Sequence, residues 1–139
     1  MNRTQLQRLA EDRVRDAKIL LDGGQWSGAY YLVGYAVEFA LKSCVLARIE
    51  QTGAFFIEKD LQKDSWTHDF EKLIKTADLT SQRGKDIQAN PALGQSWADA
   101  KDWSETARYD QKTEAQARNL YETVVDPTNG VLEWIKKYW

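Results

Sequence analysis

The apolar segment "GYAVEFALKSC", residues 34–44, contains two charged residues that could do chemistry. Glu38 and Lys42 are four residues apart, and in a helix this order and spacing form a favourable ion pair. Burying either charge alone would be costly, so both must be retained for a reason. Tyr31 and Tyr35 fall on the same helical stripe. Two interpretations remain open: a structural ion pair at the edge of the core, or a polar, tyrosine-flanked face of a pocket or partner surface.

The single histidine, His68, lies in "WTHDF". At the start of a helix it would tend to be neutral, because the positive end of the helix dipole disfavours a second positive charge. As a general base it would need an acceptor that orients the ring, and Asp69 is adjacent in sequence. The alternative is a structural histidine that caps the helix.

Arginine and aromatic side chains occur together in "DWSETARYDQ", residues 102–111. Arg108 and Tyr109 follow Trp103 closely, and a guanidinium can bind a phosphate with two hydrogen bonds and stack on a ring. An anion or a stacked base could therefore bind here. The alternative is an interhelical salt bridge with ring stacking.

Helical periodicity predicts the elements that must position these groups. Apolar residues recur at three- and four-residue spacing over residues 3–22, and glycines 23 and 24 should end that helix. Residues 26–50 are apolar almost all round, which predicts the central, most buried helix, closed by Gly53. Residues 54–66 could be a loop or a short helix. A third helix should follow, capped by Ser65 or Thr67, with Asp69 and Glu71 in its first turn.

The second half of the chain shows a less regular pattern. Residues 80–103 should be helical in parts, with interruptions at Asn90-Pro91 and at Gly94. The capping-box spacing of "TEAQ", residues 113–116, should open the last helix. Its apolar phase survives Asp126-Pro127, so we expect either one helix bent at the proline or two collinear helices with Asp126 as the second cap. The prediction is one all-α domain over residues 1–139, an up-and-down bundle of four to five helices.

Composition excludes several classes of function. A net charge of −2 over 139 residues gives no general attraction to nucleic acid, and specific DNA binding is not expected. One cysteine and one histidine cannot form an internal disulfide or a zinc cluster, so we expect no metal and no cofactor. Cys44 reads as a packing residue. The charged start and the absence of a long apolar run predict a cytoplasmic protein without a membrane segment.

Four segments in series carry a family resemblance. They are "AKILLDGGQWSGAYY" at 17–31, "YAVEFALK" at 35–42, "THDFEKL" at 67–73 and "WSETARY" at 103–109. In this order and spacing they resemble the HEPN domain (higher eukaryotes and prokaryotes nucleotide-binding). The resemblance covers nearly the whole chain. It points to seven candidate site residues: Glu38, Lys42, His68, Asp69, Trp103, Arg108 and Tyr109.

The resemblance implies a helical bundle that is usually a homodimer, often encoded in prokaryotes beside a small nucleotidyltransferase as a toxin–antitoxin or defence pair. Many members are metal-independent ribonucleases that use an arginine and a histidine separated by four to six residues. The matching positions before His68 hold Lys63, Gln62 and Leu61, so the arginine is missing. We therefore expect a non-catalytic module that binds a nucleotide, an RNA phosphate or a nucleotidyltransferase partner. The alternatives are a ribonuclease toxin rearranged around His68 and Arg108, or a structural dimerisation protein.

Overall fold

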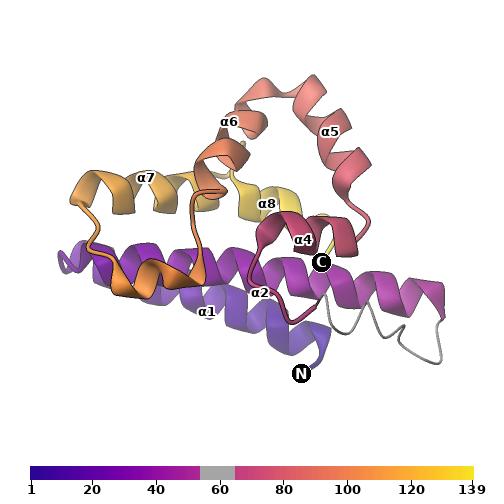
Figure 1. Ribbon diagram of the computed structural model, residues 1–139, viewed down its shortest axis with the longest axis horizontal. Coiled ribbons are helices and arrows are strands. Elements are labelled where there is room, and N and C mark those ends of the chain that lie inside the picture. The colour runs from indigo at the N-terminus through magenta and orange to yellow at the C-terminus, as the bar shows by residue number, and fades with distance from the viewer. Residues whose placement is uncertain (54–64) are drawn as a thin grey trace.

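The computed structural model describes residues 1–53 and 65–139. These residues form seven α-helices and one short 3-10 helix, without a strand (Figure 1). In chain order the elements are α1 (Arg3–Asp22), α2 (Trp26–Thr52), α4 (Phe70–Thr76), α5 (Thr80–Ala89), α6 (Pro91–Ala100), η1 (Glu105–Tyr109), α7 (Glu114–Val125) and α8 (Val131–Ile135). The all-α prediction is confirmed. Four to five helices were too few, because two expected segments are each divided into shorter helices.

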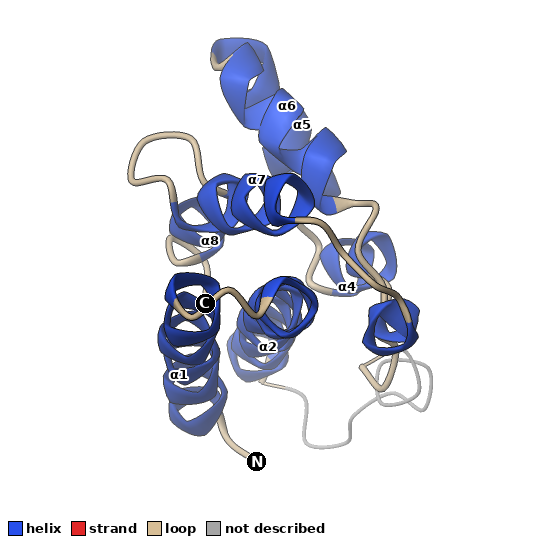
Figure 2. Cartoon of the chain, turned by 90° about the vertical axis from the view of Figure 1, so that its left-hand side faces the viewer, coloured by secondary structure: helices blue, strands red, loops and turns tan. Residues whose placement is uncertain are grey.

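The long helices α1 and α2 run antiparallel, and α4, α7 and α8 pack against α2 (Figures 1 and 2). A capping box opens α1, since Asn2 and Gln5 exchange two hydrogen bonds of 2.9 Å between side chain and backbone. The chain turns at Gly24, whose φ of 76° is accessible to glycine without strain. Both predicted helices are confirmed to within two residues at their ends. Within the described ranges, no helix has the length and apolar character required to cross a bilayer.

The short helix α4 begins two to four residues later than the predicted caps placed it. Asp69 is the N-cap, and its side chain accepts a hydrogen bond of 3.2 Å from the backbone N–H of Lys72. Ser65 and Thr67 were therefore the wrong caps, although Glu71 does lie in the first turn. His68 consequently lies in the loop before the helix and is not part of the helix. Most of the ambiguous stretch 54–66, namely residues 54–64, lies outside the described residues.

Helices α5 and α6 form a hairpin that projects from the rest of the molecule (Figure 2). Asn90 separates them as predicted, with Pro91 at the first position of α6. The predicted interruption at Gly94 was wrong, because α6 continues through it. A Cβ at Gly94 would lie 2.8 Å from the Ile87 side chain, so glycine lets the two helices approach closely.

Polar contacts attach α5 to its surroundings, since none of its side chains is buried. The carboxylate of Asp86 accepts hydrogen bonds from the Trp134 indole at 2.8 Å and the Tyr138 hydroxyl at 3.1 Å. Arg83 pairs with Glu71 through two hydrogen bonds of 2.8 and 2.5 Å. Helix α5 is therefore held by hydrogen bonds and an ion pair more than by buried side chains of its own, whereas α6 buries Leu93, Trp97 and Ala100 in the core.

The C-terminal helices α7 and α8 are separate. The predicted capping box is confirmed, because the side chains and backbone of Thr113 and Gln116 bond reciprocally at the start of α7. Asp126 accepts hydrogen bonds from the backbone N–H groups of the second and third residues after it, which builds a tight turn. The N-cap of α8 is Gly130, so neither a continuous bent helix nor an Asp126 cap is correct.

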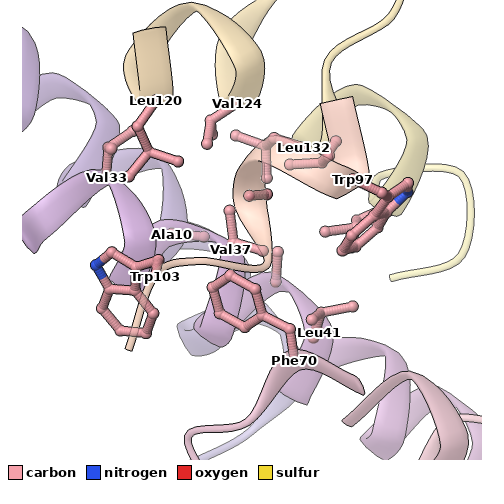
Figure 3. Packing of buried hydrophobic residues seen from close by; sticks show 14 of the residues in the cluster. Ala10, Val33, Val37, Leu41, Phe70, Trp97, Trp103, Leu120, Val124 and Leu132 are labelled. Carbon is pink, nitrogen blue, oxygen red and sulfur yellow. The ribbon is translucent and has the colours of Figure 1, made fainter. Parts of the chain in front are cut away.

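The core is centred on α2, which contributes thirteen buried residues. Figure 3 shows Val37 and Leu41 of α2 beside the ring of Phe70, with the Trp103 ring on the other side of Phe70 from Leu41. These two rings are stacked, with centroids 5.2 Å apart and planes inclined by 6°. A Cβ at Gly34 would lie 2.0 Å from the indole nitrogen of Trp103. Glycine at this position therefore allows the indole to lie directly on the α2 backbone, which fixes the segment after α6.

Candidate functional site

Glu38 is the most deeply buried acidic residue among the described ones, with 1% of its surface exposed. It lies in the middle of α2, one helical turn before Lys42, whose Nζ donates a hydrogen bond of 2.7 Å to Glu38 Oε1. The ammonium is itself only partly buried, with 19% of its side chain exposed. The helical ion pair inferred from the sequence is thus present, and the carboxylate end of it is the buried one.

His68 joins this pair from the segment that precedes α4. Its Nδ1 lies 2.9 Å from Glu38 Oε1 and 3.0 Å from Oε2, so both carboxylate oxygens face the same ring nitrogen. A carboxylate only accepts, so Nδ1 carries the proton and donates a hydrogen bond to Glu38. In a neutral ring Nε2 is then an acceptor. The His68 side chain is 41% exposed, and the buried carboxylate fixes both its tautomer and its orientation.

The three residues form a satisfied polar cluster. Burying a carboxylate without partners destabilises the folded state by roughly several kcal/mol. The Glu38 carboxylate avoids this penalty because it is bonded to the Lys42 ammonium and the His68 imidazole. The partner of His68 is therefore Glu38, thirty residues earlier. Asp69, the partner considered from sequence, caps α4 instead.

Aromatic rings in contact with one another extend from this cluster to Trp103, which lies just before the 3-10 helix. Tyr35 lies edge-on to Tyr31, His68 and Trp103, with centroid distances of 5.0, 6.2 and 5.1 Å. Burial, reinforced by a hydrogen bond with Tyr31, raises the pKa of Tyr35 above its usual range. The phenol is accordingly a neutral hydrogen-bonding group near neutral pH.

A cleft of about 760 Å³ opens beside His68. Two segments line it: residues 67–72, which lead into α4, and residues 101–105, which join α6 to η1. His68 and Asp69 belong to the first wall and Trp103 to the second, so three of the predicted site residues share this cleft. Glu38 and Lys42 do not line the cleft; Glu38 is linked to it by its hydrogen bond with the His68 ring, and Lys42 is bonded to Glu38.

Arg108 and Tyr109 lie on η1, which begins at the cleft residue Glu105, but neither of them lines the cleft. The Arg108 guanidinium lies over the Tyr109 ring at 4.6 Å, and that ring is 76% exposed. Contact with Tyr109, and more weakly with Tyr31, raises the pKa of Arg108. The stacking suggested by the sequence is present, but it occurs between neighbouring residues on the surface.

Sequence reasoning missed the lysines of the cleft. Lys72 and Lys101 line the two walls, and neither was among the candidate site residues predicted from the sequence. No spacing rule joins them, because they are twenty-nine residues apart on different elements. Trp66, which is 76% exposed two residues before His68, was also missed. An exposed tryptophan cannot be told from a core tryptophan by spacing alone.

Metal and thiol chemistry have little support in the described part of the chain. No three histidine, cysteine or acidic side chains come together there in a way that could hold a metal ion. Cys44 is buried, its thiol directed at the carbonyl oxygen of Ile135 at 3.7 Å. Burial raises its pKa to about 12, so the thiol has no nucleophilic character near neutral pH.

The fold and the cluster define an all-helical protein in which a buried carboxylate orients a partly exposed histidine at the edge of a cleft. Comparison with protein families identifies residues 4–138 as a HEPN domain. Since the match covers nearly the whole chain, the protein belongs to the HEPN family. Searches of curated proteins and of solved structures found no match.

Proposed function

We propose that this chain is a non-catalytic HEPN module that binds a nucleotide in the cleft beside His68. One observation carries the proposal: the buried Glu38 carboxylate holds Nδ1 of His68 with both oxygens, while 41% of the histidine remains exposed beside a cleft of about 760 Å³. Such a cleft is within the usual size range of small-molecule sites. A histidine held in one tautomer presents a single, defined acceptor to a ligand.

Each member of the cluster then has a distinct part. Nε2 of His68 accepts a hydrogen bond from a ribose hydroxyl or a base amino group. Glu38 positions the ring, and Lys42 compensates the charge of the buried carboxylate. Lys72 and Lys101 attract the phosphate. Arg108 and Tyr109 lie outside this cleft and would extend the site along η1.

Isothermal titration calorimetry with AMP, GMP, CMP and UMP tests the proposal. Wild-type protein should bind at least one of them, and His68→Ala should weaken binding by roughly tenfold, the loss expected for a hydrogen bond of about 1.4 kcal/mol. Arg118→Ala is a matched control, because Arg118 pairs with Glu114 on α7 and does not line the cleft. Absence of heat with all four nucleotides would refute the proposal and favour a structural interaction protein.

A ribonuclease is the second candidate, and the same histidine favours it. Pairing with a buried carboxylate is the arrangement that orients a histidine as a general base, and neutral Nε2 could accept the proton of a ribose 2′-OH. Purified wild-type protein should then degrade total RNA, and His68→Ala should abolish the cleavage. RNA left intact by the wild type would exclude this function without affecting the binding proposal.

A further inference from the structure

The cleft beside His68 carries charges of both signs on its two walls, and these charges bear on the kind of nucleotide it accepts. Lys72 and Lys101 supply two ammonium groups, and Asp102 and Glu105 supply two carboxylates. Among the described residues, none of these four groups has an ion-pair partner within 4 Å. Their charges are therefore not compensated within the described structure and are available to a ligand.

The other two carboxylates of the cleft are already engaged. Glu71 forms a two-hydrogen-bond ion pair with Arg83, which neutralises it. Asp69 caps α4, accepting a hydrogen bond from the backbone N–H of Lys72. The cap uses only one of its oxygens, so Asp69 still adds negative potential to the cleft. The uncompensated charges consequently sum to slightly negative while His68 is neutral.

From this balance we infer that the ligand is a nucleoside monophosphate, and not a nucleoside triphosphate or an RNA strand. The inference rests on the proposed function. Lys72 and Lys101 can meet one phosphate group, which ammonium groups bind as point charges. Asp102 and Glu105 can accept hydrogen bonds from ribose hydroxyls, as acidic residues do in dinucleotide sites.

Each further phosphate charge is repelled by the carboxylates of the cleft, and the residues that line the cleft include no third lysine or arginine to offset this repulsion. For two unit charges about 8 Å apart, the repulsion weakens binding by roughly 2-fold in a water-like medium and roughly 30-fold in a protein-surface medium. A nucleoside without phosphate loses the attraction of both lysines. Affinity should therefore peak at one phosphate.

Calorimetry with adenosine, AMP, ADP, ATP and a short single-stranded RNA tests the inference, with EDTA present so that Mg²⁺ does not mask the phosphate charge. AMP should bind most tightly, and each further charge should weaken binding by roughly 2- to 30-fold. ATP or RNA binding more tightly than AMP would overturn the inference while leaving nucleotide binding intact. Equal affinity for adenosine and AMP would also overturn it, because the lysines would then be unused. Silence with all five ligands and with GMP, CMP and UMP would overturn the proposed function and the inference together; if only one of those three binds, the same series is measured with its base.

Variants that remove charges from the cleft show which residues set the preference for AMP over ATP. Asp102→Asn combined with Glu105→Gln should raise ATP affinity relative to AMP, whereas Lys101→Ala should reduce AMP affinity toward that of adenosine. Glu133→Gln is the matched control, since Glu133 lies on α8 and pairs with Lys136, away from this cleft. A preference for AMP over ATP that is unchanged in the double variant would show that these carboxylates do not set it, and would overturn the inference.

Discussion

Replacing Glu38 by alanine tests the internal role of the polar cluster. The substitution leaves Lys42 and His68 without their shared acceptor, and removing one partner of a buried ion pair typically costs about 3–5 kcal/mol. Because 19% of the Lys42 side chain and 41% of the His68 side chain are exposed, both can regain water, which favours the lower end of that range. We therefore expect a loss of about 3 kcal/mol in the free energy of unfolding, or roughly 10 °C in Tm.

Urea denaturation followed by circular dichroism measures this loss. The control is Glu50→Ala, which also removes a carboxylate from α2. The ion pair that it breaks, with Arg3, is exposed: 58% of the Glu50 side chain is accessible to solvent. Such pairs contribute about 0–1 kcal/mol. If Glu38→Ala were no more destabilising than Glu50→Ala, the cluster would not be a structural element of the core, and the argument that Glu38 fixes His68 would fail.

Three further predictions concern the fold. Gly34→Ala should lower the free energy of unfolding, measured by urea denaturation, by about 1–3 kcal/mol, because the new Cβ would lie 2.0 Å from the Trp103 indole nitrogen. The control is Gly84→Ala on α5, where a Cβ meets open space, and it should be neutral or stabilising. Equal effects of the two substitutions would contradict the packing of Trp103 on Gly34. The hydrogen bonds that Asp86 accepts, chiefly the one from the Trp134 indole N–H, lower the pKa of its carboxyl. Its contribution to the stability of the fold is therefore present above about pH 4 and is lost as the pH falls below that value. Asp86→Asn should thus flatten the acid side of the stability–pH profile, and an unchanged profile would refute it. Cys44, with its pKa raised to about 12, should react with a thiol reagent at pH 8 only after unfolding in urea.

Much of the fold could be predicted from the sequence, because local signals decide it. The antiparallel pair α1 and α2 follows from apolar periodicity and from glycines at positions where the backbone turns, as Gly24 shows. The capping box at Thr113 fixed the start of α7. The errors occurred where tertiary contacts outweigh local preference. Gly94 stays helical because α6 packs closely on Ile87, a contact that no local pattern reports.

The site could be predicted only in part, for the same reason. The pairing of Glu38 with Lys42 is local, four residues along one helix, and was evident from spacing. The pairing of Glu38 with His68 joins α2 to the segment before α4, and periodicity contains no information about it. The convergence of Lys72 and Lys101 on one cleft likewise depends on how α4 meets the end of α6.

The central claim is that His68, held by Glu38, is the ligand-binding group of this protein. Because the chain has a single histidine, its ring signals can be assigned without ambiguity in a ¹H–¹⁵N NMR spectrum. In its neutral form the ring should appear as the Nδ1-protonated tautomer, and addition of AMP should shift the Nε2 signal in a saturable manner. An Nε2-protonated ring, or ring signals unmoved at an AMP concentration that saturates calorimetric binding, would contradict the account.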